Sequence, residues 1–180
     1  MKKTKAKEEK LKRLPGTRQK LKEIISEDRI YVDKTPYIYK MLTELDVYYL
    51  FLSRPRRFGK TLLLDTLSEL FLGRRHLFEN LWIGRETDYD FQPHPVIRLS
   101  MNYAETDSPA LLKNYIIGDL LEAAESMEVT ITRTEYDSIL RELLKKLSRK
   151  HGTGAAVLID EYDAPVAGHI DRPDLARANS

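Results

Sequence analysis

Residues 53–61 (SRPRRFGKT) are of the types that bind phosphate groups in proteins. An apolar run precedes them and a helical pattern of leucines follows, so the segment is predicted to join a strand to a helix. In such a loop, backbone N–H groups at the start of the helix point at phosphate oxygens. Lys60 would reach the terminal phosphates as a mobile positive charge, and the Thr61 hydroxyl would ligate the Mg²⁺ that bridges them. The predicted phosphate-binding residues are Arg54, Pro55, Arg56, Arg57, Phe58, Gly59, Lys60 and Thr61.

This loop departs from the general phosphate-binding pattern at one position. The pattern has glycine five residues before Gly59, and this chain has Arg54 there, whose Cβ limits how tightly the loop can turn. The loop could therefore also be a basic surface turn without a ligand. Its arginines could contact phosphate or a neighbouring subunit's nucleotide, or they could be charges on an exposed loop.

A second motif, which is acidic, lies about a hundred residues after the loop, at the end of the apolar run 155–159. Asp160 at the strand end would hold Mg²⁺, and Glu161 would polarise the attacking water as general base. Alone, this pair could be an ordinary solvated strand terminus. Together with the loop, it predicts that Lys60 and the acidic pair meet at one end of a common sheet around a metal-bound triphosphate. Lys60 and Glu161 are the predicted catalytic residues.

Alternating apolar runs and helical patterns indicate the elements that position these groups. We predict strands over 47–52, 95–99 and 155–159, and helices over 17–26, 37–45, 60–72, 109–127 and 134–150, with a short helix around residues 77–82. Ser108 before Pro109 and Thr134 with Asp137 are predicted helix starts, and Gly73 is a predicted helix stop. The pattern predicts an α/β fold in which a parallel sheet is flanked by helices.

Composition excludes several classes of protein. The chain has 180 residues, 42% hydrophobic and 32% charged, which is typical of a globular domain. It has no cysteine, which excludes disulfides and thiol catalysis, and no apolar stretch long enough for a membrane span, so a soluble cytoplasmic protein is expected. The net charge is only +2, yet residues 1–22 hold ten Lys or Arg and two Glu. That segment could be a solvated tail or an arm that binds nucleic acid.

Three segments of the sequence resemble the bacterial and archaeal AAA-ATPase-like family: residues 31–35 (YVDKT), 51–61 (FLSRPRRFGKT) and 158–165 (LIDEYDAP). The resemblance spans about residues 13–166, and the family itself has Arg where Arg54 stands. Residues 95–99 resemble the family's second core strand, although Ser100-Met101-Asn102 replaces the usual acidic-aromatic continuation. The resemblance implies a P-loop NTPase fold that binds ATP and Mg²⁺. In this family the domain usually precedes a nuclease-like domain of the restriction-endonuclease fold.

The resemblance also sets expectations for domains and activity. It implies a basic flexible tail over 1–13, a partial P-loop domain over 14–166 and a truncated segment over 167–180. The family's extra strand, between the P-loop strand and the Asp160 strand, follows the Asp-Glu motif in sequence, so an incomplete sheet and a fragment are expected. The expected function is a Mg-dependent ATPase, with hydrolysis only if the fold is completed. Residues 31–34 are hypothesised to lie near the base or ribose.

Two alternatives of other classes stay open. The chain could be a catalytically inactive remnant that binds nucleotide, or that docks on a full-length homologue or a second copy through its incomplete sheet. It could also bind nucleic acid through the basic N-terminal arm.

Overall fold

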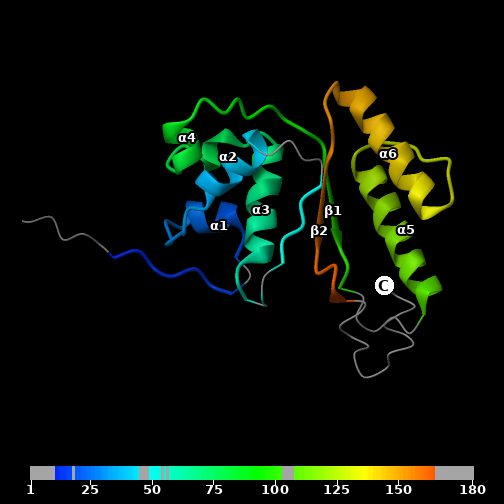
Figure 1. The fold of residues 1–180 in the computed structure, drawn as a ribbon, viewed down its shortest axis with the longest axis horizontal. Helices are drawn as coiled ribbons and strands as arrows, with labels where there is room; N and C mark the ends of the chain where they lie inside the picture. Colours follow the sequence, from blue (N-terminus) through cyan, green and yellow to red (C-terminus); the bar gives the residue numbers. More distant parts are fainter. Residues whose placement is uncertain are drawn as a thin grey trace, which may run out of the picture.

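The computed structural model describes residues 11–17, 19–44, 49–53, 55, 57–102 and 108–164. These residues form a mixed α/β structure with a two-stranded parallel sheet flanked by helices (Figure 1). The helices are α1 (Leu21–Ser26), α2 (Thr35–Thr43), α3 (Lys60–Phe71), the 3₁₀ turn η1 (Arg75–Leu77), α4 (Trp82–Glu86), α5 (Pro109–Ser126) and α6 (Tyr136–His151). The strands are β1 (Val96–Ser100) and β2 (Ala156–Asp160).

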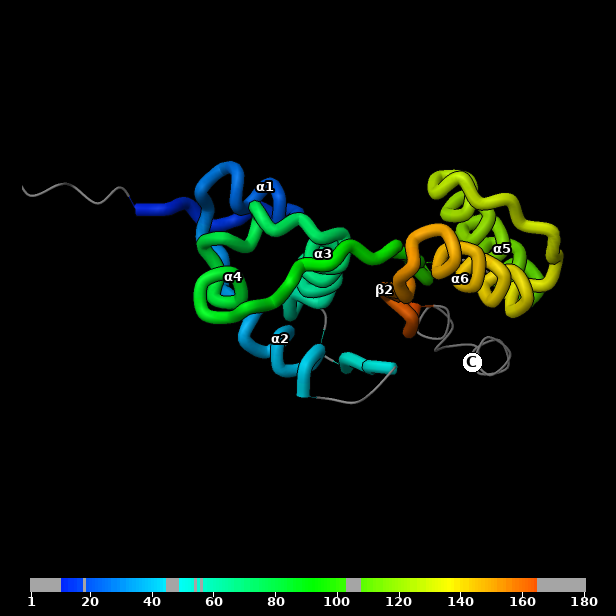
Figure 2. Tube along the Cα trace, turned by 90° about the horizontal axis from the view of Figure 1, so that it is seen from above, coloured from blue at the N-terminus to red at the C-terminus, as the bar shows by residue number. Residues whose placement is uncertain are grey.

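The sheet lies between two groups of helices. β1 and β2 pair in parallel, with Val96 opposite Ala156 and Ser100 opposite Asp160. α1 to α4 lie on one side of the sheet and α5 with α6 on the other, as the two views agree (Figures 1 and 2). Because the strands are parallel, their carboxyl ends share one edge, which is the lower edge in Figure 1.

Each face of the sheet has its own hydrophobic core. Buried residues of α1 to α4 pack together with Leu158 of β2, whereas α5 and α6 pack on Ile97 and Leu99 of β1. β1 therefore alternates, with Ile97 and Leu99 toward α5 and α6 and Arg98 toward α3. Burying one such large apolar side chain stabilises the fold by about 1.5–3 kcal/mol. The apolar faces of the helices thus cover both faces of the sheet.

Several predicted helix boundaries are confirmed and others are wrong. The helix predicted over 17–26 begins only at Leu21, and the short helix predicted around residues 77–82 is replaced by η1 and α4 with a turn between them. Ser108 caps α5 by accepting a hydrogen bond from Leu111 N at 3.2 Å, and Gly73 follows α3 in the left-handed region with φ 70°. The predicted capping box of Thr134 and Asp137 does not form. α6 instead begins at Tyr136 after the N-cap residue Glu135, and the Glu142 carboxylate accepts from the backbone N–H groups of residues 132 and 133 before the helix.

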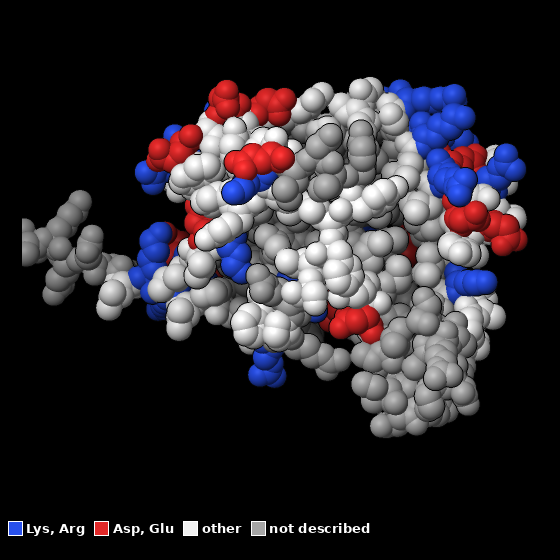
Figure 3. Space-filling view, viewed as in Figure 1, with Lys and Arg blue, Asp and Glu red and all other residues white. Residues whose placement is uncertain are grey.

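The predicted strand over 47–52 is not a strand in its described part. Residues 49–52 have no regular structure, and their side chains are 40–94% exposed. An apolar run becomes a strand only where a neighbouring strand pairs with its backbone, and none of the described residues does so here. Figure 3, drawn from the same side as Figure 1, shows mainly residues other than Lys, Arg, Asp and Glu among the described residues in the middle of this face. The sheet of the described residues therefore consists of β1 and β2.

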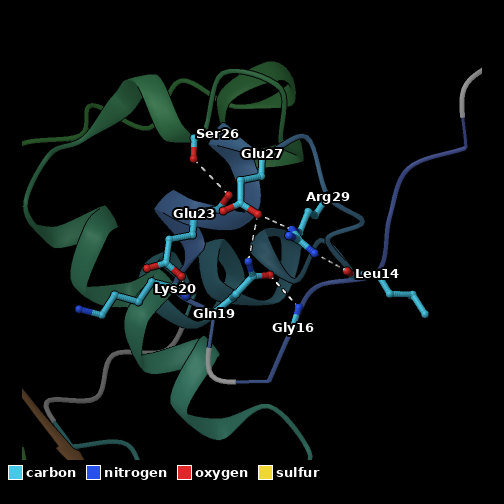
Figure 4. A network of polar contacts seen from close by, with 8 residues as sticks. All are labelled: Leu14, Gly16, Gln19, Lys20, Glu23, Ser26, Glu27 and Arg29. Atoms are coloured by element: carbon cyan, nitrogen blue, oxygen red, sulfur yellow. Dashed lines mark hydrogen bonds and ion pairs between the residues drawn. The ribbon is translucent and has the colours of Figure 1, made fainter.

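The segment before α1 is fastened to it by polar contacts (Figure 4). Arg29 donates to the Leu14 carbonyl at 3.1 Å and pairs with Glu27, which also accepts from Gln19. Arg29 and then Gln19 lower the pKa of the Glu27 carboxyl. Lys12 pairs with Asp28 at 2.6 Å and the Arg13 carbonyl accepts from Ile30 N at 2.9 Å, so the chain contacts the folded part from residue 12. Most of the predicted tail, and the predicted segment 167–180, lie outside the described residues.

Candidate functional site

The N-terminus of α3 has no side-chain cap. Gly59 precedes the helix in the left-handed region with φ 77°, and the first helical hydrogen bond runs from Leu63 N to the Gly59 carbonyl at 2.9 Å. Among the described residues, no side chain caps the helix, and its first turn holds no acidic residue. The first N–H groups of a helix need acceptors, and the helix dipole makes that end positive. This helix start is therefore suited to an anion.

The loop before α3 adopts a constrained backbone. Arg57, like Gly59, lies in the left-handed region, with φ 67°, a conformation that costs a residue with a Cβ roughly 1–2 kcal/mol. Phe58 and Thr61 are exposed and Lys60 is half-buried, so the lysine and the hydroxyl reach the surface at the same turn. Arg54 and Arg56 lie outside the described residues, and Pro55 is exposed.

The acidic pair lies at the carboxyl end of β2. The Asp160 carbonyl accepts from Met101 N at 3.0 Å, and its carboxylate oxygen Oδ1 accepts from Glu161 N at 2.9 Å. Glu161 is exposed and left-handed, with φ 50°. The Glu161 carbonyl accepts from Ala164 N, which closes a turn after the strand. Within the described residues, the second Asp160 oxygen makes no hydrogen bond, so it is available to a ligand.

The two motifs lie at the same edge of the molecule. α3 contacts β2, and the N-terminus of α3 and the carboxyl ends of the strands both lie at the lower edge of Figure 1. The rings of Phe51, before the loop, and Tyr162, after the acidic pair, have centroids 4.6 Å apart at 59°. Among the described contacts, no hydrogen bond or ion pair joins Lys60 to Asp160 or Glu161. That the two motifs share one ligand stays a prediction.

The segment 31–35 is built into the protein frame. The Tyr31 hydroxyl and Thr66 Oγ1 of α3 are 3.1 Å apart, and burial raises the pKa of Tyr31. Asp33 accepts from Thr35 N at 2.8 Å through one oxygen and from Trp82 N at 2.7 Å through the other. Tyr31 and Asp33, two residues of the segment hypothesised to contact the base or ribose, thus have protein partners. The sequence analysis gave these side chains no such role.

Asp65 also supports the site, and its role was not predicted from the sequence. It lies on the inner face of α3, accepts from Leu21 N at 2.8 Å, and pairs with Arg98 of β1 at 2.9 Å. Its side chain is only 6% exposed. An acidic residue within the apolar pattern of residues 62–71 is the signal that could have found it. Asp65 fastens the helix that begins at Lys60 to both α1 and the sheet.

The described surface has two hollows away from this edge. A cavity of about 440 Å³ lies at the end of α5, and one of about 360 Å³ lies between the ends of α3, α5 and α6. Neither is lined by a predicted site residue. Among the described residues, no three His, Asp or Glu side chains gather as in a metal site made by protein alone. A hydroxyl and a carboxylate nevertheless fit Mg²⁺ that takes its remaining ligands from phosphate and water.

Comparison with known proteins gives the family. A family profile described as predicted AAA-ATPase, AAA-ATPase-like, matches residues 15–180. The chain belongs to this AAA-ATPase-like family. An uncharacterized protein from the vnfD 5′ region of Azotobacter chroococcum mcd 1 is 36% identical over 151 residues, which are 84% of this chain and 29% of that protein. The chain thus spans less than a third of that relative's length, and no solved structure matches the chain.

The family supports nucleotide binding in general terms. The match contains both motifs, since it runs from residue 15 past Glu161 to the last residue. In the part of the chain that the structure describes, no helix has the length and apolar character needed to cross a bilayer. Most of the basic N-terminal arm, for which nucleic-acid binding was the alternative, lies outside that part.

Proposed function

We propose that this AAA-ATPase-like chain binds Mg-ATP at the N-terminus of α3, in a P-loop NTPase fold, and hydrolyses it to ADP and phosphate. The observation that carries the proposal is the uncapped start of α3, which follows the left-handed Gly59 and carries Lys60 and Thr61 in its first turn. The acidic end of β2 at the same edge supports it (Figure 1). The family's description as a predicted AAA-ATPase supports it independently.

The proposal assigns phosphate binding to the loop and the helix start. The first backbone N–H groups of α3 donate to phosphate oxygens, and the helix dipole contributes about 0.3–1 kcal/mol, up to about 2 kcal/mol in a partly buried site. Lys60 neutralises charge on the terminal phosphates, and the residues from Arg54 to Phe58 complete the loop. Thr61 and Asp160 hold Mg²⁺, which neutralises the charge that develops on the phosphates.

Glu161 is the proposed general base. It accepts the proton of the attacking water as the water oxygen bonds to the γ-phosphorus and the bond to the β–γ bridging oxygen breaks. Its exposed position after the strand leaves space for water and triphosphate. The cytoplasm, where ATP is abundant, is the compartment we propose. Assembly with a second copy or with a longer homologue is part of the proposal and is measured by sedimentation with and without ATP.

Binding of a fluorescent ATP analogue tests the nucleotide site. We expect Mg²⁺-dependent binding by the wild type and at least about ten-fold weaker binding by Lys60→Ala, because a charge-assisted contact contributes about 1.5–3 kcal/mol. Lys145→Ala is the matched control, since that lysine lies exposed on α6. Equal affinities of wild type and Lys60→Ala would contradict the proposal.

Turnover tests the catalytic part separately. Phosphate release is measured for the wild type and for Glu161→Gln, which keeps the size of the side chain and removes its basic group. We expect Glu161→Gln to bind ATP with unchanged affinity and to lose turnover. Binding without turnover in the wild type would favour the inactive nucleotide-binding alternative over the enzyme.

A further inference from the structure

Lys34 is held in place from both sides by neighbours with fixed partners. Asp33, before it, bonds both Thr35 N and the start of α4, and the buried Thr35 accepts from Ile83 N at 3.1 Å. Lys34 itself is the N-cap residue, immediately before the first residue of α2. Its backbone therefore has little freedom, and only its side chain can move. A cation presented in this way loses less entropy on binding than one on a free loop.

The Lys34 ammonium group reaches the turn that opens α3. A Cβ placed on Gly59 would lie 3.4 Å from Lys34 Nζ, in ordinary contact distance. Gly59 is the residue immediately before Lys60, so the two lysines approach the same turn from different elements. Lys34 comes from the start of α2 and Lys60 from the start of α3.

Among the described residues, no ion pair neutralises the two lysines at this turn. The Asp33 carboxylate is used by α4 and Thr35, and the Asp65 carboxylate by Leu21 and Arg98. None of the ion pairs among the described residues includes Lys34 or Lys60. Two ammonium groups beside the positive end of a helix repel one another unless an anion lies between them.

We propose that Lys34 is a second phosphate-binding lysine, which donates to the polyphosphate chain of the nucleotide together with Lys60. This inference rests on the proposed function and adds a residue to its site. Within the segment 31–35, Tyr31, Asp33 and Thr35 then hold the frame, and Lys34 contacts the ligand. Bound nucleotide would also link the loop to α2 and, through Asp33, to α4.

Nucleotide affinity of charge variants tests the role of Lys34. Lys34→Met removes the charge and keeps the length of the side chain, and Lys34→Arg keeps the charge. Lys40→Met is the matched control, because Lys40 lies on the same helix, is exposed, and pairs only with Glu44 among the described residues. Displacement of a fluorescent analogue gives the affinity for ATP, ADP and AMP, and thermal unfolding without ligand reports on the fold.

We expect Lys34→Met to weaken ATP binding about ten-fold or more, ADP binding less, and AMP binding less than about two-fold. Lys34→Arg should recover part of the loss. Lys40→Met should bind as the wild type does, and the unliganded midpoint of Lys34→Met should be unchanged. Equal weakening for all three nucleotides would overturn the inference, because it would point to a loss of loop shape rather than of a phosphate contact.

The two proposals fail in different ways. If Lys60→Ala weakens ATP binding and Lys34→Met does not, the nucleotide site stands and the role of Lys34 is refuted. If the wild type binds no nucleotide, both are refuted. An acyl-phosphate derivative of ATP gives a readout on the unmodified protein, because it acylates lysines beside the bound phosphates. Acylation of Lys34 that excess ATP suppresses is the expected result, and acylation of Lys60 without Lys34 would refute the inference.

Discussion

Removing the Asp65 carboxylate should destabilise the fold measurably. Asp65→Ala leaves the Leu21 N–H without an acceptor in a fully buried position, which costs about 1–3 kcal/mol. It also breaks the ion pair with Arg98, whose side chain is 42% exposed and can be hydrated, so this loss is about 0.5–1 kcal/mol. The free energy of unfolding should therefore fall by about 1.5–4 kcal/mol. Asp65→Asn keeps an oxygen for Leu21 N and should cost only about 1 kcal/mol.

Urea denaturation followed by far-UV circular dichroism measures both variants. The midpoint should fall while the slope m stays constant, and Glu79→Ala on the exposed surface should change stability by less than about 0.5 kcal/mol. Equal losses for Asp65→Ala and Asp65→Asn would refute the reasoning, since the ion pair and not the buried N–H would then dominate. A loss below about 0.5 kcal/mol for Asp65→Ala would refute it as well.

Three further outcomes follow from other parts of the fold. Gly84→Ala should lower stability by about 1–3 kcal/mol or more in a denaturant titration, because its Cβ would lie 2.2 Å from the Phe78 carbonyl oxygen. Gly118→Ala in the open interior of α5 should instead raise stability by about 0.5–1 kcal/mol, and a loss there would be contrary to the structure. Lys146 and the backbone N–H of residue 132 lower the pKa of Glu142 to about 2 from 4.5, so its carboxylate stabilises the fold above about pH 4.5 and loses that effect as the pH falls toward 2. Glu142→Gln should therefore have a lower melting temperature than the wild type at neutral pH, with a difference that shrinks below pH 4.5; a pH-independent difference would contradict this.

Local patterns predicted most of the elements. β1 and β2 lie within one residue of the apolar runs that predicted them, and Ser108 and Gly73 mark helix ends as their chemistry implies. The run at 49–52 has the same apolar character and forms no strand. Sequence composition reports that a segment is apolar, whereas strand formation also needs a paired neighbour, which no local pattern contains.

The sequence predicted the two motifs of the candidate site, but not the residues that hold those motifs in place. Lys60 and Asp160 were predicted at one edge on the premise that a strand precedes the helix of Lys60, but residues 49–52 form no strand, so a common site stays a prediction. The supports join residues far apart in sequence: Asp65 bonds a residue 44 positions away, and Asp33 one 49 positions away. A single sequence does not show such pairings, so the role of the segment 31–35 required the structure.

A crystal structure with Mg²⁺ and a non-hydrolysable ATP analogue would test the central claim most directly. The proposed site predicts the triphosphate at the N-terminus of α3, with the metal between Thr61 and Asp160. A nucleotide bound elsewhere on the protein, with α3 unoccupied at its start, would contradict it.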